Sequence, residues 1–277
     1  MLNPLFSFMA LLGVLYTIRT QGKELREARE ETRIANRIQD KQTAVFERQN
    51  FESVFFRLID VHARTAERIR SDGDSKSGLN GFEVIVRAVL EAYGDNQFHA
   101  ELNKRTPKPQ YEVEGEAEEQ DWGYMEQAVK YGIQSSDKVQ LSQYYRNIYQ
   151  ILKLIDGFKL SSGDEHIGGK TRRQLRLEYF QRRQYCNFLR AQLSDDELKL
   201  LFFNCITDSG AGLKLYVERY SLLKHLHMSE FVGGKKHLVD MYDAVAYADY
   251  EDISDDQIQQ FANVHSRAQY RAVFPSR

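Results

Sequence analysis

The chain has 277 residues, a formal net charge of -2 and a pI near 6.4, which argues against a nucleic-acid binder that works through overall positive charge. Binding of nucleic acid through a local basic patch is the alternative that this charge balance does not exclude. The length is ample for a buried core, and only 4 prolines with long runs of Leu, Glu, Lys, Arg and Gln predict an all-α fold. Cys186 and Cys205 lie within apolar helical patterns and are predicted to be reduced core thiols.

The N-terminal stretch carries no charged residue from Met1 to Ile18. As a helix it would reach roughly 27 Å, just short of a hydrocarbon core of about 30 Å, and we interpret residues 1–20 as a membrane anchor. Basic residues follow directly at Arg19, Lys23, Arg26 and Arg29. The positive-inside tendency then predicts a single-pass protein of the bacterial inner membrane with its domain in the cytoplasm. The alternative is an apolar helix packed on the domain or on a dimer partner.

Residues 21–50 are highly charged and predict a helical stalk. Lys23 with Glu27 and Arg26 with Glu30 have the four-residue spacing that supports an exposed helix. A heptad interpretation from Leu25 places three glutamines and a threonine in the seam, so pairing into a homo-oligomer through the stalk would be loose. A solvated single helix is the alternative.

The domain that follows, residues 51–230, is predicted to be a helical bundle, because apolar residues recur three and four apart. Helices are expected at 51–69, 82–93, 125–132, 139–155, 172–193, 195–206 and 213–223. Residues 97–121 hold two prolines and an acidic run, which predict a loop. Ser194 with Glu197, and Ser254 with Gln257, have the spacing of capping boxes. Residues 231–277 form a C-terminal helical extension whose tail, from Tyr270, is predicted to be loose.

Two segments carry a family resemblance. The first holds Tyr144, Tyr145, Arg146 and Tyr149, and the second holds Arg190, Ala191, Gln192, Leu193, Glu197 and Asn204. Together they resemble the AbiC-like family of phage abortive infection proteins. The resemblance extends upstream to residues 3–25 and 50–62, which look like the family's membrane segment and first domain helix. It implies a role in phage defence and supplies no reaction.

The motifs of common catalytic sites do not occur. The sequence GGKT at 168–171 lacks the earlier glycine of a phosphate-binding loop, and the seven histidines show no metal-ligand spacing. We therefore expect no metal and no cofactor.

Two arginine–histidine pairs have the loose spacing used by helical RNases of the HEPN class, in which histidine acts as acid or base and arginine steadies a phosphate. They are Arg57 with His62 and Arg219 with His225. At 100° per residue neither pair shares one face of a helix, and His62 lies on the apolar stripe, which favours a neutral core histidine.

A second set of candidates comes from the residues of the resemblance. Arg146 and Arg190 lie on helices rich in apolar residues, where an unpaired guanidinium would be costly, so each needs a carboxylate, a carbonyl or a ligand anion. The candidate carboxylate partners of these two arginines are Glu178, Glu197 and Asp156. If Arg146, Arg190, Gln192, Glu197 and Asn204 converge, they form a ligand-binding polar pocket; the alternative is a structural network that fixes helix register.

These observations favour a membrane-anchored bacterial anti-phage defence protein, a sensor or effector that acts through membrane association and assembly and responds to a phage-derived trigger. One alternative is a HEPN-like RNase effector that cleaves host or phage RNA. Another is a non-catalytic membrane scaffold for a partner protein.

Overall fold

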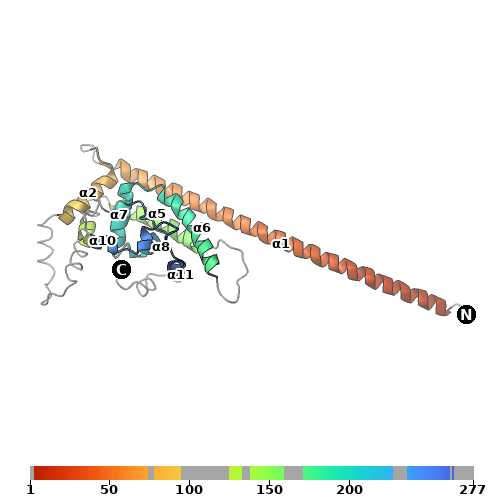
Figure 1. Ribbon diagram of the computed structural model, residues 1–277. Coiled ribbons are helices and arrows are strands. Elements are labelled where there is room, and N and C mark those ends of the chain that lie inside the picture. The colour runs from red at the N-terminus through yellow and green to blue at the C-terminus, as the bar shows by residue number, and fades with distance from the viewer. Residues whose placement is uncertain are drawn as a thin grey trace. The chain divides into compact units, whose positions relative to one another are not determined.

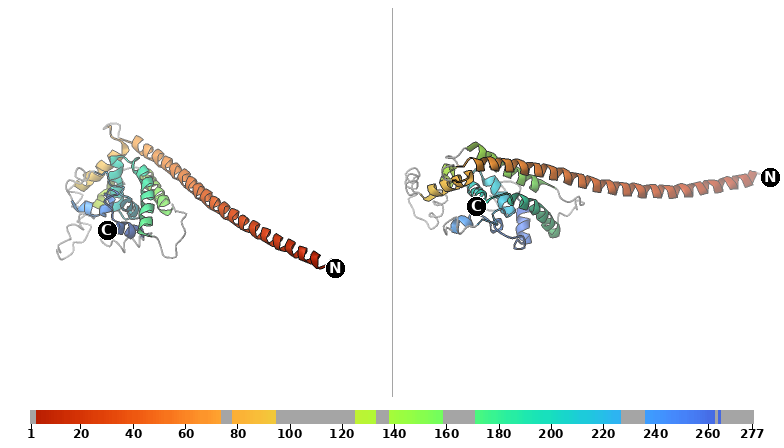
Figure 2. Two further views of the ribbon diagram at one scale, coloured as in Figure 1. Left: turned by 45° about the vertical axis from the view of Figure 1, so that its right-hand side comes forward. Right: turned by 90° about the horizontal axis from the view of Figure 1, so that it is seen from above.

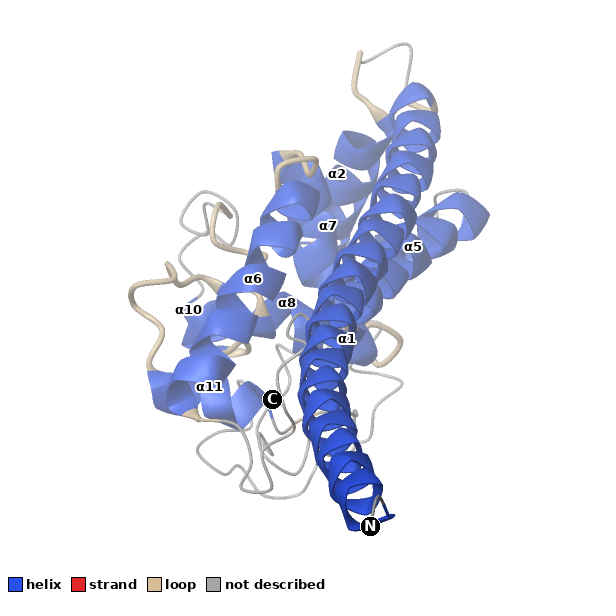
Figure 3. Cartoon of the chain, turned by 90° about the vertical axis from the view of Figure 1, so that its right-hand side faces the viewer, coloured by secondary structure: helices blue, strands red, loops and turns tan. Residues whose placement is uncertain are grey.

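The computed structural model describes residues 3–73, 78–94, 125–132, 138–158, 171–226, 236–262 and 264. All regular elements in these ranges are helices, and no sheet occurs among them (Figure 3). The all-α prediction is confirmed. The loop predicted at 97–121 and the tail predicted from Tyr270 lie outside the described residues.

The helices follow one another along the chain as labelled in Figure 1, and a further helical stretch occupies 125–132. Their bounds are α1 Asn3–Ser71, α2 Gly81–Gly94, α5 Lys138–Gly157, α6 Arg172–Arg190, α7 Asp195–Ile206, α8 Ala211–Arg219, α10 Lys236–Asp240, the 3₁₀ helix η1 Ala244–Ala246, and α11 Asp255–Ala262. The sequence divides α1 into an anchor, a stalk and a first domain helix. The structure makes these one continuous helix of 69 residues.

Two compact units meet within α1, namely Met1–Ser53 and Val54–Arg277. The first unit is helical along its described length, with its side chains almost all exposed. Ion pairs four residues apart support it, with 3.6 Å between Lys23 Nζ and Glu27 Oε1 and 2.9 Å between Arg48 Nε and Glu52 Oε1.

The predicted transmembrane helix is not supported. Within the part of the chain that the structure describes, no helix has an apolar stretch long enough to cross a bilayer. Met1 and Leu2, the first residues of the predicted anchor, lie outside the described residues.

The second unit has its core around α7 and α8. Leu200 to Ile206 on α7 and Leu213 to Arg219 on α8 are buried without interruption. Helix α7 contacts α2 and α8, while α8 also contacts α5 and η1. The further views in Figure 2 show α5 to α8 gathered in this unit. Burial on every side of α7 and α8 marks them as central helices.

Helix α5 contributes one apolar face, as its spacing predicts. Six of its side chains are fully buried at intervals of three and four residues, namely Leu141, Tyr144, Ile148, Ile151, Leu152 and Ile155. Helix α6 contacts both α5 and α11, so it holds the C-terminal α11 against the bundle.

The helix starts follow local side-chain chemistry. Both predicted capping boxes are confirmed: Ser194 and Glu197 bond reciprocally at the start of α7, and Ser254 and Gln257 do so at the start of α11. A third box, not predicted, joins Thr171 and Gln174 at the start of α6.

Candidate functional site

The pair Arg57 and His62 is separated by burial. Arg57 is exposed, whereas His62 is 1% exposed and packs against the Tyr144 ring, with the two ring centroids 4.8 Å apart. Burial lowers the pKa of His62 from 6.5 to about 4. The imidazole is therefore neutral at physiological pH and enclosed within the core, where Arg57 does not reach it.

The pair Arg219 and His225 is separated in the opposite sense. Arg219, the last residue of α8, is buried, whereas His225 is exposed in the turn that follows. The Arg219 guanidinium points to Asp156 on α5, with 2.5 Å between Arg219 Nη1 and Asp156 Oδ1. The structure thus brings Arg219 to a carboxylate and leaves the histidine at the surface.

The residues of the polar set have separate partners. Arg146 is exposed and lies 3.4 Å from Ser142 Oγ on its own helix, while Arg190 is half-buried and donates to the Ser221 carbonyl at 3.0 Å. Gln192 is exposed and Asn204 is buried. Among the described residues no hydrogen bond or ion pair joins members of this set to one another.

Glu197 instead organises a buried network of its own. Arg70, near the end of α1, donates to Glu197 Oε2 at 2.9 Å, and the Tyr144 hydroxyl donates to Oε1 at 3.2 Å. The Ser194 backbone N–H also donates to this fully buried carboxylate, at 2.8 Å. Glu197 therefore ties α1, α5 and the start of α7 together. Sequence reasoning missed Arg70 because 127 residues separate it from Glu197.

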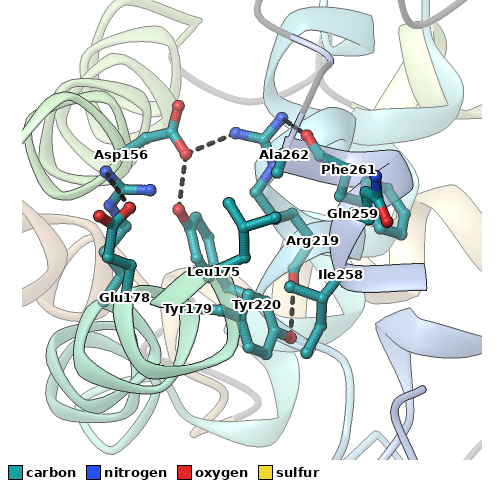
Figure 4. A pocket seen from close by; sticks show the side chains of 11 residues that line it. Asp156, Leu175, Glu178, Tyr179, Arg219, Tyr220, Ile258, Gln259, Phe261 and Ala262 are labelled. Carbon is teal, nitrogen blue, oxygen red and sulfur yellow. Dashed lines mark hydrogen bonds and ion pairs between the residues drawn. The ribbon is translucent and has the colours of Figure 1, made fainter. Parts of the chain in front are cut away.

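A cavity of about 380 Å³ lies among α5, α6, α8 and α11 (Figure 4). The spacing of three and four residues on α6 turns one of its faces toward the cavity, and the first turn beyond α8 and the end of α11 complete the wall. The lining residues are Asp156, Leu175, Glu178, Tyr179, Arg182, Arg219, Tyr220, Ile258, Gln259, Phe261 and Ala262.

Asp156 is the centre of the hydrogen bonding in this pocket. Its Oδ1 accepts from Arg219 Nη1 and from the Tyr220 hydroxyl, each at 2.5 Å, and Figure 4 shows both bonds reaching the same oxygen. Burial and the charge of Asp156 raise the pKa of Tyr220 well above its usual value. Tyr220 is consequently a hydrogen-bond donor and not a base at neutral pH.

Arg219 also fastens the C-terminal helix. Its Nη2 donates to the Phe261 carbonyl at 2.7 Å and to the Val264 carbonyl. At the other end of α11, Arg176 Nη1 lies 2.6 Å from Asp255 Oδ1. Arginines of α6 and α8 thus hold α11 along the edge of the pocket.

On the α6 side Arg182 contacts two groups. Arg182 Nη2 lies 3.9 Å from Glu178 Oε2 and donates to the Phe158 carbonyl at 3.2 Å. Burial raises the pKa of Tyr179 to about 12, and its hydroxyl donates to the Arg219 carbonyl at 2.7 Å. The described lining contains no serine, cysteine or histidine. This arrangement is suited to holding a polar ligand, and it offers no nucleophile–base pair of the serine or cysteine type.

Sequence reasoning named Asp156, Glu178 and Arg219 but not their grouping with Arg182. The sequence suggests Asp156 and Glu178 as partners of Arg146 and Arg190. In the structure Asp156 pairs with Arg219. The one local signal is the three- and four-residue spacing that places Glu178 and Arg182 on one face of α6.

Comparison with known proteins matches part of the chain to a family model. No curated protein and no solved structure matches the chain. The resemblance predicted from Tyr144 to Asn204 is confirmed, although its upstream parts at 3–25 and 50–62 lie outside the matched segment. Residues 136–231, which include seven of the eleven residues lining the pocket, match the model of the family described as "Putative phage abortive infection protein".

Proposed function

We propose that the chain is a bacterial phage-defence protein of the abortive-infection type, which stops the growth of an infected cell before the phage spreads. The match of residues 136–231 to the family is the observation that carries this proposal. The matched segment contains α5 to α8, the helices that form the core of the second unit, so the likeness concerns the body of the domain.

The protein acts as a sensor or effector through membrane association and assembly. The support comes from the first unit, where nine large apolar side chains between Phe6 and Ile18 are each at least 49% exposed. A contiguous apolar surface of this kind is a typical interaction site, and it is suited to contact with the membrane interface or to burial between helices. The apolar segment continues directly into a charged helix up to Ser53, so the whole first unit is helical along its described length.

The burial of the two arginine–histidine pairs favours this class over the RNase alternative. In both arginine–histidine pairs, one member is buried and the other exposed, so neither pair offers the two groups to one phosphate. A scaffold that only holds a partner would share the association surface and differ in having no response of its own to infection.

The test is phage plating efficiency, with culture growth followed at high phage dose. It compares the full-length chain with the double variant Leu11→Asp/Leu15→Asp, which places charges in the apolar run. The matched control Gln39→Asp/Gln42→Asp adds the same charges to exposed polar positions of the same helix. Sedimentation of cell extracts with membranes, and the oligomeric state after detergent extraction, report association directly.

We expect the full-length chain and the glutamine control to reduce plating and to halt the infected culture, and the leucine variant to lose protection, membrane sedimentation and assembly together. Failure of the full-length chain to protect against a broad phage panel would refute the defence role. Equal protection by both double variants would refute the association mechanism alone.

A further inference from the structure

The size and walls of the pocket suit a small molecule. Its volume of about 380 Å³ lies at the lower end of the range of small-ligand sites, about 300–1,000 Å³. Leu175, Ile258 and Phe261 give it apolar walls, and the rings of Tyr179 and Tyr220 stack with centroids 6.0 Å apart. The ligand that fits is one whose charged groups are few and whose remaining surface is apolar.

One hydrogen-bond acceptor in the pocket has no partner among the described residues. Both bonds to Asp156 reach Oδ1, and among the described residues Oδ2 has no hydrogen-bond partner (Figure 4). An ionised carboxylate accepts at both oxygens. The Asp156 side chain retains 14% exposure, so its second oxygen is open to a donor that enters the cavity.

One donor is left over on the facing helix. Arg182 uses Nη2 for the Phe158 carbonyl and for the long contact with Glu178, and Nη1 has no partner among the described residues. A guanidinium carries five N–H donors, and this side chain retains 22% exposure. Arg182 can therefore donate a hydrogen bond to a carboxylate without giving up its present contacts.

The charge balance selects the net charge of the ligand. Arg182 and Arg219 face Asp156 and Glu178, so the described lining holds two basic and two acidic side chains. A purely anionic or purely cationic ligand would leave one charge uncompensated in a largely buried place. A molecule with one positive and one negative group adds no net charge and uses both leftover groups.

We propose that this pocket binds a small zwitterion, of the size of a free amino acid or a dipeptide, with its ammonium group on Asp156 and its carboxylate on Arg182. The ring or aliphatic part of the ligand lies against Leu175 and the α11 side chains. This site is independent of how the protein acts in phage defence, because it is derived from the pocket alone.

The test is thermal unfolding of the full chain with single L-amino acids and dipeptides at millimolar concentration. A ligand at ten times its Kd raises the Tm by about 3–6 °C. Three further probes separate the contributions: the amino acid amide lacks the carboxylate, the N-acetyl derivative lacks the ammonium group, and inorganic phosphate is a plain anion.

We expect at least one zwitterion to raise the Tm, and its amide, its N-acetyl derivative and phosphate to fail. Arg182→Gln should weaken binding about tenfold or more, since it removes a charge-assisted hydrogen bond. Leu175→Trp should abolish binding by filling the cavity, while Arg173→Gln, at an exposed position of the same helix, should bind as the unaltered chain does.

Three results would overturn the proposal: no zwitterion in the panel raises the Tm; the amide and N-acetyl derivatives bind equally well; or Arg182→Gln and Leu175→Trp, each shown to be folded by circular dichroism, both retain full affinity. These readouts do not involve phage, so they separate failure of the pocket proposal from failure of the defence role.

Discussion

Replacing His62 by phenylalanine isolates the cost of a buried imidazole. The ring lies in the core beside Tyr144, and both ring nitrogens lack a hydrogen-bond partner among the described residues. The pKa of about 4 results chiefly from burial, with the charge of Glu197 acting against the lowering and that of Arg70 adding to it. Phenylalanine keeps a flat ring in place and removes both nitrogens.

The sign of the pH effect on stability follows from the protonation of His62 in the folded and unfolded states. Between pH 6.5 and about 4 the unfolded chain binds a proton at His62 that the folded protein does not, so the free energy of unfolding decreases as the pH falls. The free energy of unfolding decreases by about 1.4 kcal/mol for each pH unit, so the full window lowers it by about 3 kcal/mol. His62→Phe should remove this loss, and its stability at neutral pH should equal or exceed that of the unaltered chain because no hydrogen bond is lost.

Urea unfolding followed by circular dichroism, repeated from pH 6.5 down to pH 4, measures the effect. His225→Phe is the comparison variant, since it removes a histidine whose side chain is exposed. If the unaltered chain and His62→Phe lose the same free energy across the window, the imidazole is not held neutral by burial and the reasoning is refuted.

Three further predictions concern stability and reactivity. Asp156→Ala leaves the buried Arg219 guanidinium without its carboxylate and should cost about 3–5 kcal/mol in urea unfolding; a cost below about 1 kcal/mol would contradict this ion pair. Ser194→Ala removes the N-cap of α7 and should cost about 1 kcal/mol, and an unchanged urea midpoint would argue against the cap. Burial raises the pKa values of Cys186 and Cys205, so both thiols should react with Ellman's reagent only after unfolding; rapid labelling of the folded protein would contradict their placement.

Local patterns predicted much of the fold. The capping box at Ser194 and the spacing from Tyr144 to Ile155 each depend on residues within a few positions of one another, so helix starts and buried faces could be inferred without tertiary information. The apolar N-terminal stretch shows the limit of composition. Its freedom from charge predicts a membrane span, whereas no helix among the described residues is long and apolar enough to be one.

The candidate site was harder to predict from the sequence, because the side chains that pair in it are distant along the chain. Asp156 and Arg219 are 63 residues apart, and no spacing rule relates side chains on different helices. The interval between Arg219 and His225 suggested a catalytic pair, but the helix ends at Arg219 and the following turn carries the histidine to the surface. Pairing across helices depends on packing, which the sequence alone did not provide.

The bonds from Arg219 to the carbonyls of Phe261 and Val264 have a consequence for protein engineering. The segment that matches the family ends at residue 231, yet one of its buried guanidinium groups is solvated by backbone some thirty residues further on. A graft of the matched segment into another protein would transfer the arginine without its acceptors. The segment that matches the family model is thus shorter than the segment whose buried polar groups are paired with one another.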